Sequence, residues 1–367
     1  MSDVENEKKK HPVTGALMHW YQQSKRDLPW RDANDPYKIW LSEIILQQTR
    51  VDQGMPYYYR FIEKFPTVHA MAEASEDEIL HLWQGLGYYA RARNMHRAAQ
   101  ILSKEWKTFP ADYAAIRALP GVGDYTAAAV ASIAFNLPHA AVDGNVNRVL
   151  SRIWGVSHAV DGTEGKKIIA QLSNELLDET QPGAYNQAMM ELGALCCKPR
   201  NPNCACCPVS NWCFALKHKR QTEFPIKKKA KETQVRHFNF LIFTDNSGFT
   251  LLEKRNNRDI WKGLYQFPLI ESDAERQAID IPQGGQLIRV YNGINHQLSH
   301  RLLKIKFWHI HFNGAFPDST MAYHRIAFSD WTTVALPRAI TRFLEQYSST
   351  LQIEQPLPKI KNKNPSK

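Results

Sequence analysis

Four cysteines near residue 200 are spaced so that they could hold one inorganic centre. They follow the pattern C-x6-C-x2-C-x5-C and are Cys197, Cys204, Cys207 and Cys213. Closely spaced thiols in a chain whose start has no secretory pattern favour metal over disulfides. Four thiolates with no nearby histidine suit either a cubane iron–sulfur cluster or a tetrahedral zinc ion, and spacing alone leaves that choice open. Cys196 and Cys206 are not expected to be ligands, because each only duplicates a neighbouring ligand position.

Two carboxylates could do acid–base work. Glu43 lies in LSEIILQQT between apolar residues, so we expect it to be partly buried with a raised pKa. The alternative is an ordinary exposed helix glutamate. Asp143, in VDGNVNRVL, lies in a turn beside Gly144 and ahead of a helix. It could face a cleft, or it could only cap that helix.

A glycine-containing turn precedes the helical stretch expected at 125–135. The segment LPGVGDYTA places Gly121, Val122 and Gly123 just before a helix whose first amides are unpaired. Such a hairpin can offer backbone N–H groups to a phosphate. The alternative is an ordinary turn between two helices. Asp124 is expected to cap the following helix, since its charge would repel phosphate.

The elements that must position these residues fall into two regions. Residues 11–215 carry apolar residues at three- and four-residue spacing, which predicts an all-α domain with helical stretches at 41–51, 76–104 and 125–135. From about Val235 the pattern changes to short alternating segments, which predict strands at 237–243, 249–254 and 302–312 in an α+β domain spanning 235–350. The remaining segments are expected to be a tail at 1–10, a basic linker at 216–234 and a basic tail at 351–367.

The net charge of +10 comes from two segments. Lys217–Lys231 and the four lysines after residue 358 account for all of it, so the domains themselves are close to neutral. We interpret both segments as a solvated linker and tail rather than as a dedicated binding surface. Any DNA affinity of the folded domains must then come from where their charges are placed rather than from bulk charge. The longest small or apolar run, 127–135, is far shorter than the ~20 residues that a membrane span needs. We expect a cytoplasmic, nucleoid-associated protein.

Several motifs together resemble one enzyme superfamily. Residues 11–215 are similar throughout to the helix-hairpin-helix DNA glycosylases, and within them to the MutY-type adenine DNA glycosylases. The matching segments, in order, are LSEIILQQTRV, GLGYYARARN, LPGVG and VDGNVNRVL. The four-cysteine spacing resembles the loop that holds a [4Fe-4S] cluster in this superfamily. The resemblance therefore implies a [4Fe-4S] cofactor and a helix-hairpin-helix glycosylase domain with an iron–sulfur loop.

One position separates two activities in this superfamily. The related endonuclease III branch has a lysine two residues after the hairpin, and its amine attacks the sugar and leads to strand cleavage. This chain has Tyr125 there, and a phenol cannot form a Schiff base. The resemblance thus implies a monofunctional glycosylase. The rivals are a bifunctional lyase acting on oxidised pyrimidines and a DNA-binding or redox-sensing module without catalysis.

The resemblance also implies roles for the carboxylates. Glu43 would protonate adenine as it leaves, and ionised Asp143 would support positive charge on the deoxyribose. Asn145 would orient water or the carboxylate, and Tyr125 would hydrogen-bond near the sugar and Asp143. The adenine must first leave the duplex.

Four further positions match DNA-contacting residues of the family. Arg31 and Gln187 correspond to residues that line the adenine pocket. Gln48 and Tyr88 correspond to side chains inserted into the duplex at the lesion, although Tyr88 could instead be a core residue.

The C-terminal region resembles a Nudix-like domain through IWKGLYQFP, residues 260–268. No carboxylate box of the type REx2EEx2G follows, so magnesium-dependent pyrophosphate hydrolysis is not expected. In the family this domain reads 8-oxoguanine through a Phe-Ser-His loop, which here becomes Leu298, Ser299 and His300. The leucine keeps apolar contact but removes aromatic stacking. The expected partner is double-stranded DNA with adenine opposite 8-oxoguanine or guanine, bound by a monomer.

Overall fold

The computed structural model describes residues 11–31, 35–106, 108–229, 232–256 and 259–353. The predicted N-terminal tail and residues 354–367 of the predicted C-terminal tail lie outside this part of the chain. The chain divides into two compact units. Unit 1 comprises Met1–Glu73 with Asn94–Ala230, and unit 2 comprises Ala74–Arg93 with Lys231–Lys367, each as far as it is described.

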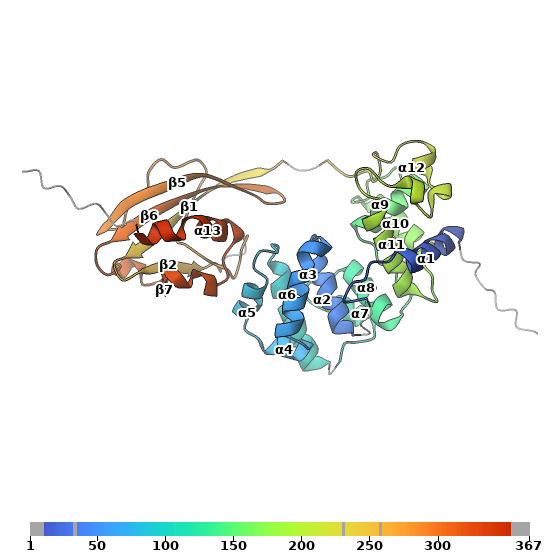
Figure 1. Cartoon of the computed structure of the whole chain (residues 1–367), viewed down its shortest axis with the longest axis horizontal. Helices are drawn as coiled ribbons and strands as arrows, with labels where there is room; N and C mark the ends of the chain where they lie inside the picture. The colour runs from blue at the N-terminus through green and yellow to red at the C-terminus, as the bar shows by residue number, and fades with distance from the viewer. Residues whose placement is uncertain (1–10, 32–34, 107, 230–231, 257–258, 354–367) are drawn as a thin grey trace, which may run out of the picture. The chain divides into compact units, whose positions relative to one another are not determined.

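Unit 1 is helical, as predicted (Figure 1). Two 3-10 turns, Cys204–Cys206 and Ser210–Trp212, lie in its cysteine loop. Its helices are α1 (Pro12–Ser24), α2 (Pro36–Leu46), α3 (Val51–Lys64), α4 (Val68–Glu73), α7 (Tyr113–Ala118), α8 (Asp124–Phe135), α9 (Gly144–Trp154), α10 (Thr163–Glu175), α11 (Pro182–Leu195) and α12 (Phe214–Lys217), and α6 (Ala90–Glu105) begins in unit 2 and continues into unit 1. A core of fully buried side chains such as Leu17, Leu150 and Leu192 joins α1, α9 and α11. This core fixes α9 and α11 beside each other.

Two predicted helical stretches are shorter than expected. The stretch 41–51 ends at Leu46, because Gln48 has a left-handed backbone with φ 56° before α3 begins. The stretch 76–104 divides into α5 (Glu76–Leu82) and α6, since Gly85, Gly87 and Tyr88 all have positive φ. Glycine tolerates that conformation, which ends a helix even where apolar spacing continues. Periodicity alone did not reveal either break.

The predicted cap at Asp124 is wrong. Gly123 is the N-cap of α8, and Asp124 is its first helical residue. The Asp124 carboxylate instead pairs with Arg117, with 2.5 Å between Oδ1 and Nε. An acidic residue in the first turn still stabilises a helix through the helix dipole.

Unit 2 contains a seven-stranded sheet with the order β3-β2-β1-β6-β5, in which β4 also pairs with β1 and β7 with β2. β1 and β6 run parallel, and the other strand pairs of the described sheet are antiparallel. The strands are β1 (Gln234–Asp245), β2 (Phe249–Lys254), β3 (Tyr265–Gln266), β4 (Leu269–Ser272), β5 (Gly285–Gln297), β6 (Arg301–Phe312) and β7 (His324–Ala327). The three predicted strands correspond to β1, β2 and β6. Further elements are α5, 3-10 turns at Asp318–Thr320 and Phe328–Thr333, and α13 (Arg338–Ile353).

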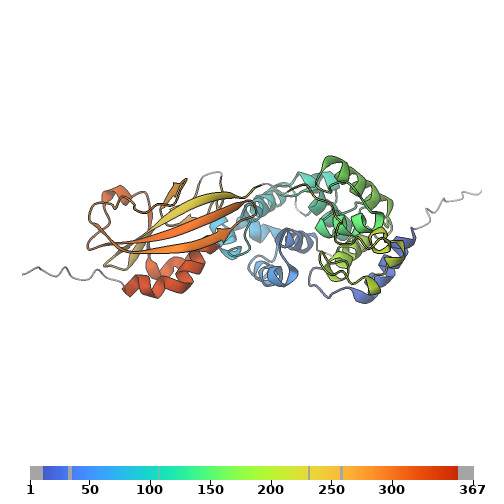
Figure 2. The same ribbon diagram turned by 90° about the horizontal axis from the view of Figure 1, so that it is seen from above.

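Helix α13 covers one face of this sheet (Figure 2). Phe343 of α13 stacks on Phe307 of β6, with ring centroids 3.8 Å apart. The opposite face carries a second core that includes Leu241, Trp308 and Phe312. The α+β class predicted for this region is therefore confirmed. None of the described helices is both long and apolar enough to cross a membrane.

Candidate active site and cysteine loop

A cavity of about 170 Å³ in unit 1 is lined by α2, α8, α9, α11 and the segment before α2. Six residues proposed from the sequence line it: Arg31, Glu43, Tyr125, Asp143, Asn145 and Gln187. They come from parts of the chain more than 150 residues apart. The fold brings these six side chains to one cavity.

Glu43 lies in the middle of α2 and is only 8% exposed. Burial raises the pKa of this carboxyl to about 7. The Tyr125 hydroxyl opposes that shift by donating a hydrogen bond to Oε2 over 2.5 Å, whereas the nearby charge of Asp143 adds to it. The expected burial and raised pKa of Glu43 are both confirmed.

Tyr125 occupies the first turn of α8 and is bonded to Glu43 rather than to Asp143. Its hydroxyl also lies 3.2 Å from the sulfur of Met190. Burial and the two neighbouring carboxylates raise the pKa of this phenol well above its ordinary value. Tyr125 therefore keeps its proton and can act as a hydrogen-bond donor at neutral pH.

Asp143 both caps α9 and faces the cavity. Its Oδ1 accepts hydrogen bonds from the backbone N–H groups of Asn145 (2.8 Å) and Val146 (2.7 Å), and its Oδ2 accepts one from Asn145 Nδ2 (2.8 Å). Burial raises the pKa of Asp143, and these three hydrogen bonds oppose that shift. Asn145 is itself held by Arg148, whose Nη2 donates to Asn145 Oδ1 over 2.8 Å. The two alternatives weighed for Asp143 are thus compatible.

A buried glutamate that sequence reasoning missed lies behind Arg31. Glu191 of α11 has a side chain only 1% exposed and accepts from Arg31 and Arg26, each at 2.7 Å. Burial acts to raise the pKa of Glu191, but the hydrogen bonds from the two arginines lower it to about 2. Gln187, which also lines the cavity, accepts a hydrogen bond at Oε1 from the Tyr21 hydroxyl over 2.8 Å. The sequence feature that could have indicated Glu191 is its place within the apolar run MMELGAL, which resembles the apolar surroundings of Glu43.

The two glycines of the hairpin between α7 and α8 differ in whether a side chain would fit in their place. Gly121 has φ 77°, and a Cβ there would lie 2.6 Å from Cβ of Asn94. At Gly123, the N-cap, a Cβ would meet nothing within 4 Å. Val122 between them is buried. The turn is therefore anchored on one side and open in front of the first amides of α8.

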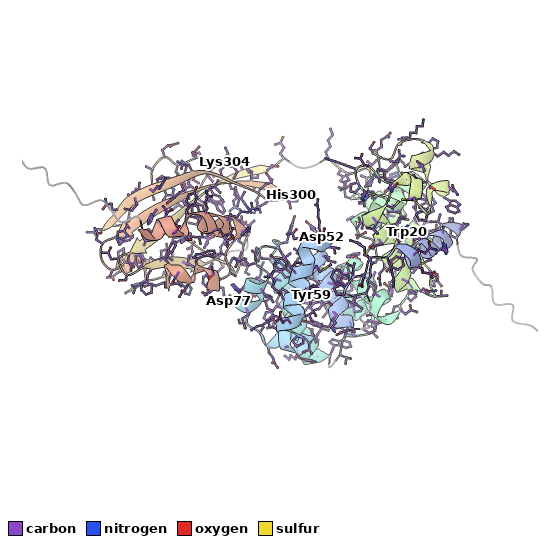
Figure 3. All side chains as sticks on the ribbon, in the orientation of Figure 1. Trp20, Asp52, Tyr59, Asp77, His300 and Lys304 are labelled. Carbon is purple, nitrogen blue, oxygen red and sulfur yellow. The ribbon has the colours of Figure 1, made fainter. Side chains whose placement is uncertain are left out.

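The remaining predicted DNA-contacting residues lie outside the cavity. Gln48 is exposed at its left-handed turn in unit 1. Tyr88 belongs to unit 2 and is 48% exposed, so it is not a core residue. Its hydroxyl is hydrogen-bonded to Ser299. Ser299 and His300 are exposed between β5 and β6, where Figure 3 labels His300, and Leu298 is half-buried.

The cysteine loop encloses a small cavity of about 20 Å³ next to α9. Cys196 and all four predicted ligands, Cys197, Cys204, Cys207 and Cys213, line it. Buried Arg152 donates to Cys197 Sγ over 3.4 Å, while Cys206 is exposed. Within the described part of the chain, no three His, Cys, Asp or Glu side chains are arranged to hold a single metal ion. The four predicted thiols line one cavity, as a centre ligated by four thiolates requires.

Comparison with known proteins agrees with both units. Residues 41–179 match the family described as HhH-GPD superfamily base excision DNA repair protein, and residues 239–346 match the NUDIX domain. One similar solved structure, a thermostable thymine-DNA glycosylase, is 29% identical with a TM-score of 0.52, over 56% of this chain and 95% of that one. Fold and site together define a DNA glycosylase of base excision repair that carries a Nudix-like domain.

Similar curated proteins narrow the class. The chain is 35% identical to the adenine DNA glycosylase of Buchnera aphidicola subsp. Baizongia pistaciae, over 79% of this chain and 83% of that protein. It is 33% identical to that of Arabidopsis thaliana (77% and 52%) and 42% identical to that of Homo sapiens (57% and 40%). The chain therefore belongs to the adenine DNA glycosylase family, and it is an enzyme that acts on DNA.

Proposed function

We propose that this enzyme removes adenine paired with 8-oxoguanine or guanine by hydrolysing the N-glycosidic bond. The observation that carries the proposal is Glu43, a buried carboxyl with a pKa of about 7 in the same cavity as Asp143. Two carboxyls with different environments can divide acid and charge-stabilising roles. The proposal places this chemistry in residues 11–215 and lesion reading in residues 235–350.

Glu43 supplies the proton. Adenine is a poor leaving group as an N9 anion, so its ring must be protonated while the bond breaks. With a pKa of about 7, Glu43 keeps its proton in a substantial fraction of molecules at neutral pH. Because the acid form is the active one, the excision rate should fall as pH rises above 7.

Asp143 supports the sugar. Its carboxylate faces the cavity on three hydrogen bonds that fix its direction, and negative charge held there stabilises a developing oxocarbenium ion. Asn145 is the positioning partner, and it can also orient the attacking water. Tyr125 donates to Glu43 and thereby fixes the acid before substrate arrives.

Adenine is held by Arg31 and Gln187, and Glu191 and Tyr21 fix those two side chains. Gln48 and Tyr88 enter the duplex beside the extruded base, and the amides around Gly121, Val122 and Gly123 contact a DNA phosphate. Leu298, Ser299 and His300 read the opposite base. Their exposure supports contact with DNA, since none of the three is fully buried in unit 2.

The reaction stops at the abasic site. Tyr125 has no amine, and its raised pKa leaves it a neutral phenol. Product strands should stay intact until heated with alkali, and borohydride should trap no covalent adduct. Spontaneous nicking with trapping would contradict this assignment.

We further propose that Cys197, Cys204, Cys207 and Cys213 hold a [4Fe-4S] cluster that stabilises the loop rather than reacting with substrate. Iron and sulfide analysis tests this, with about four irons expected per chain. Cys207→Ser should reduce iron content and DNA affinity, and Cys206→Ser is the matched control. Zinc in place of iron would refute the cluster. The enzyme is proposed to act as a cytoplasmic monomer on the nucleoid.

The deciding experiment measures excision in parallel on duplexes with adenine opposite 8-oxoguanine, guanine and thymine. Full-length protein should release adenine fastest opposite 8-oxoguanine and more slowly opposite guanine. Equal rates on all three duplexes would remove the proposed mispair preference, and no release from any of them would remove the activity.

A further inference from the structure

A groove of about 230 Å³ lies on the sheet of unit 2, on the face opposite α13. We call it the bulge groove. Its lining includes Gly293 and seven polar residues: His237, Asn239, Glu275, Arg276, Asn295, Lys304 and Lys306. The strand register places Lys304 of β6 between His237 of β1 and Asn295 of β5. Because side chains alternate along a strand, Lys304 and Lys306 share this face.

A β-bulge hollows the groove. The pairing of β5 with β6 passes from Tyr291–Phe307 to Ile294–Ile305, so two residues of β5, Asn292 and Gly293, oppose one residue of β6. Gly293 has φ 78°, and a Cβ there would meet nothing within 4 Å. A bulge takes its extra residue out of the strand ladder and re-aims the chain. Space therefore opens where a regular strand would place a side chain.

The charges in the groove are unequal. Lys306 is largely covered, and its Nζ lies 2.9 Å from Glu275 and donates to the backbone carbonyl of Arg276 over 2.7 Å. This pair holds the segment 275–276 at the rim. Arg276 and Lys304 are exposed. Among the described residues that line the groove, Glu275 is the only carboxylate, and it is paired with Lys306. The remaining charge is therefore positive and favours an anion.

The groove is also close in sequence to the loop proposed to read the lesion. Lys304 follows His300 by four residues along β6, which spans about 13 Å at ~3.3 Å per residue. Figure 3 labels both residues on unit 2. Duplex DNA rises about 3.4 Å per nucleotide of one strand, so the groove lies within about four nucleotides of a base held at the loop.

We propose that the bulge groove binds a backbone phosphodiester of the DNA strand whose base meets Leu298, Ser299 and His300, through Arg276 and Lys304. This inference rests on the proposed function for the position of that strand. A phosphodiester fits the anionic preference of the groove and its position beside the loop. A free phosphate ester shares the chemistry, and the experiment separates the two sources.

The test measures how DNA affinity depends on salt. Full-length, cluster-loaded protein is titrated against a duplex that carries 8-oxoguanine opposite a 2′-fluoro-2′-deoxyadenosine, because the fluorine destabilises the sugar cation and slows excision. Each phosphate contact contributes about 0.9 to the slope of log K against log salt. Lys304→Ala should therefore reduce the slope by about 1, and Lys304→Arg should restore it.

Arg342→Ala is the matched control, because Arg342 is an exposed cation on α13, at the opposite face of the same sheet. It should leave the slope unchanged. A wild-type slope in Lys304→Ala, or an equal loss in Arg342→Ala, would overturn the assignment. So would binding of a deoxynucleoside monophosphate that needs Lys304 while the duplex slope does not change. Failure of the proposed function is separate, since it appears as no adenine release by the wild type.

Discussion

The active-site cavity of unit 1 and the exposed loop of unit 2 are built in opposite ways. In the cavity, three carboxylates each accept a hydrogen bond from another side chain. Glu43 accepts from Tyr125, Asp143 from Asn145, and Glu191 from Arg31. In the loop, Ser299 and His300 are exposed between two strands. Burial and hydrogen bonding give the cavity carboxyls shifted pKa values, whereas the side chains of Ser299 and His300 are accessible to a ligand. Under the proposed function, burial positions the groups that cleave the bond, and exposure leaves the loop accessible to the opposite base.

This comparison predicts the largest effect at Glu43. Glu43→Gln keeps the shape of the side chain but cannot donate a proton, so single-turnover excision should fall by about a hundred- to ten-thousandfold while mispair binding persists. Binding by anisotropy and excision by product quantification separate the two. Near-normal turnover would remove Glu43 from the chemistry. Ser299→Ala is the contrasting variant, because it should retain most of the excision rate.

The second effect concerns Glu191 and the stability of unit 1. Glu191→Gln leaves the guanidinium of Arg31, which is 9% exposed, without its counter-charge, and should cost about 3–5 kcal/mol in the free energy of unfolding. Urea denaturation measures this. Glu223→Gln, which breaks the exposed pair with Arg220, is the control and should change little.

The difference in unfolding free energy between wild type and Glu191→Gln should depend on pH. The folded-state pKa of Glu191 is about 2, below its ordinary value of 4.5. Its stabilisation is thus complete above pH 4.5 and is lost as pH falls towards 2. The gap in unfolding free energy between wild type and Glu191→Gln should narrow across that range. A gap that stays constant would show that the variant acts through packing alone.

Smaller effects are expected at the loop. Ser299→Ala with His300→Ala removes one or two hydrogen bonds of ~1 kcal/mol each, which corresponds to roughly five- to thirtyfold in discrimination. The preference for adenine opposite 8-oxoguanine over guanine should fall by that factor, measured as the ratio of excision efficiencies. An unchanged ratio would mean that the loop does not read the lesion.

The sequence predicted the helical and α+β regions from the spacing of apolar residues, and it predicted six of the residues that line the cavity, in part through the family resemblance. It did not predict the breaks at Gln48 and at Gly85–Tyr88, where backbone conformation rather than periodicity ends a helix. Strand β5 was missed since its exposed polar residues weaken the alternation. Glu191 was missed because its partners, Arg26 and Arg31, lie about 160 residues away in the chain. Long-range pairs of this kind exist only in the fold.

The smallest effect is expected from substituting Leu298, and it tests how this residue affects the preference for 8-oxoguanine over guanine. Leu298 is half-buried, so part of its side chain is already covered within unit 2. Leu298→Phe adds a ring that can stack on the oxidised base, and such aromatic contact is worth about 0.5–1.5 kcal/mol beyond burial. The preference for 8-oxoguanine should then hold or rise by up to roughly tenfold, measured on the two mispairs in parallel. Leu298→Met is the control, since it keeps apolar volume without a ring. If both variants lower the preference equally, Leu298 acts by supporting the shape of the loop, and exposure of Ser299 and His300 depends on packing beneath them.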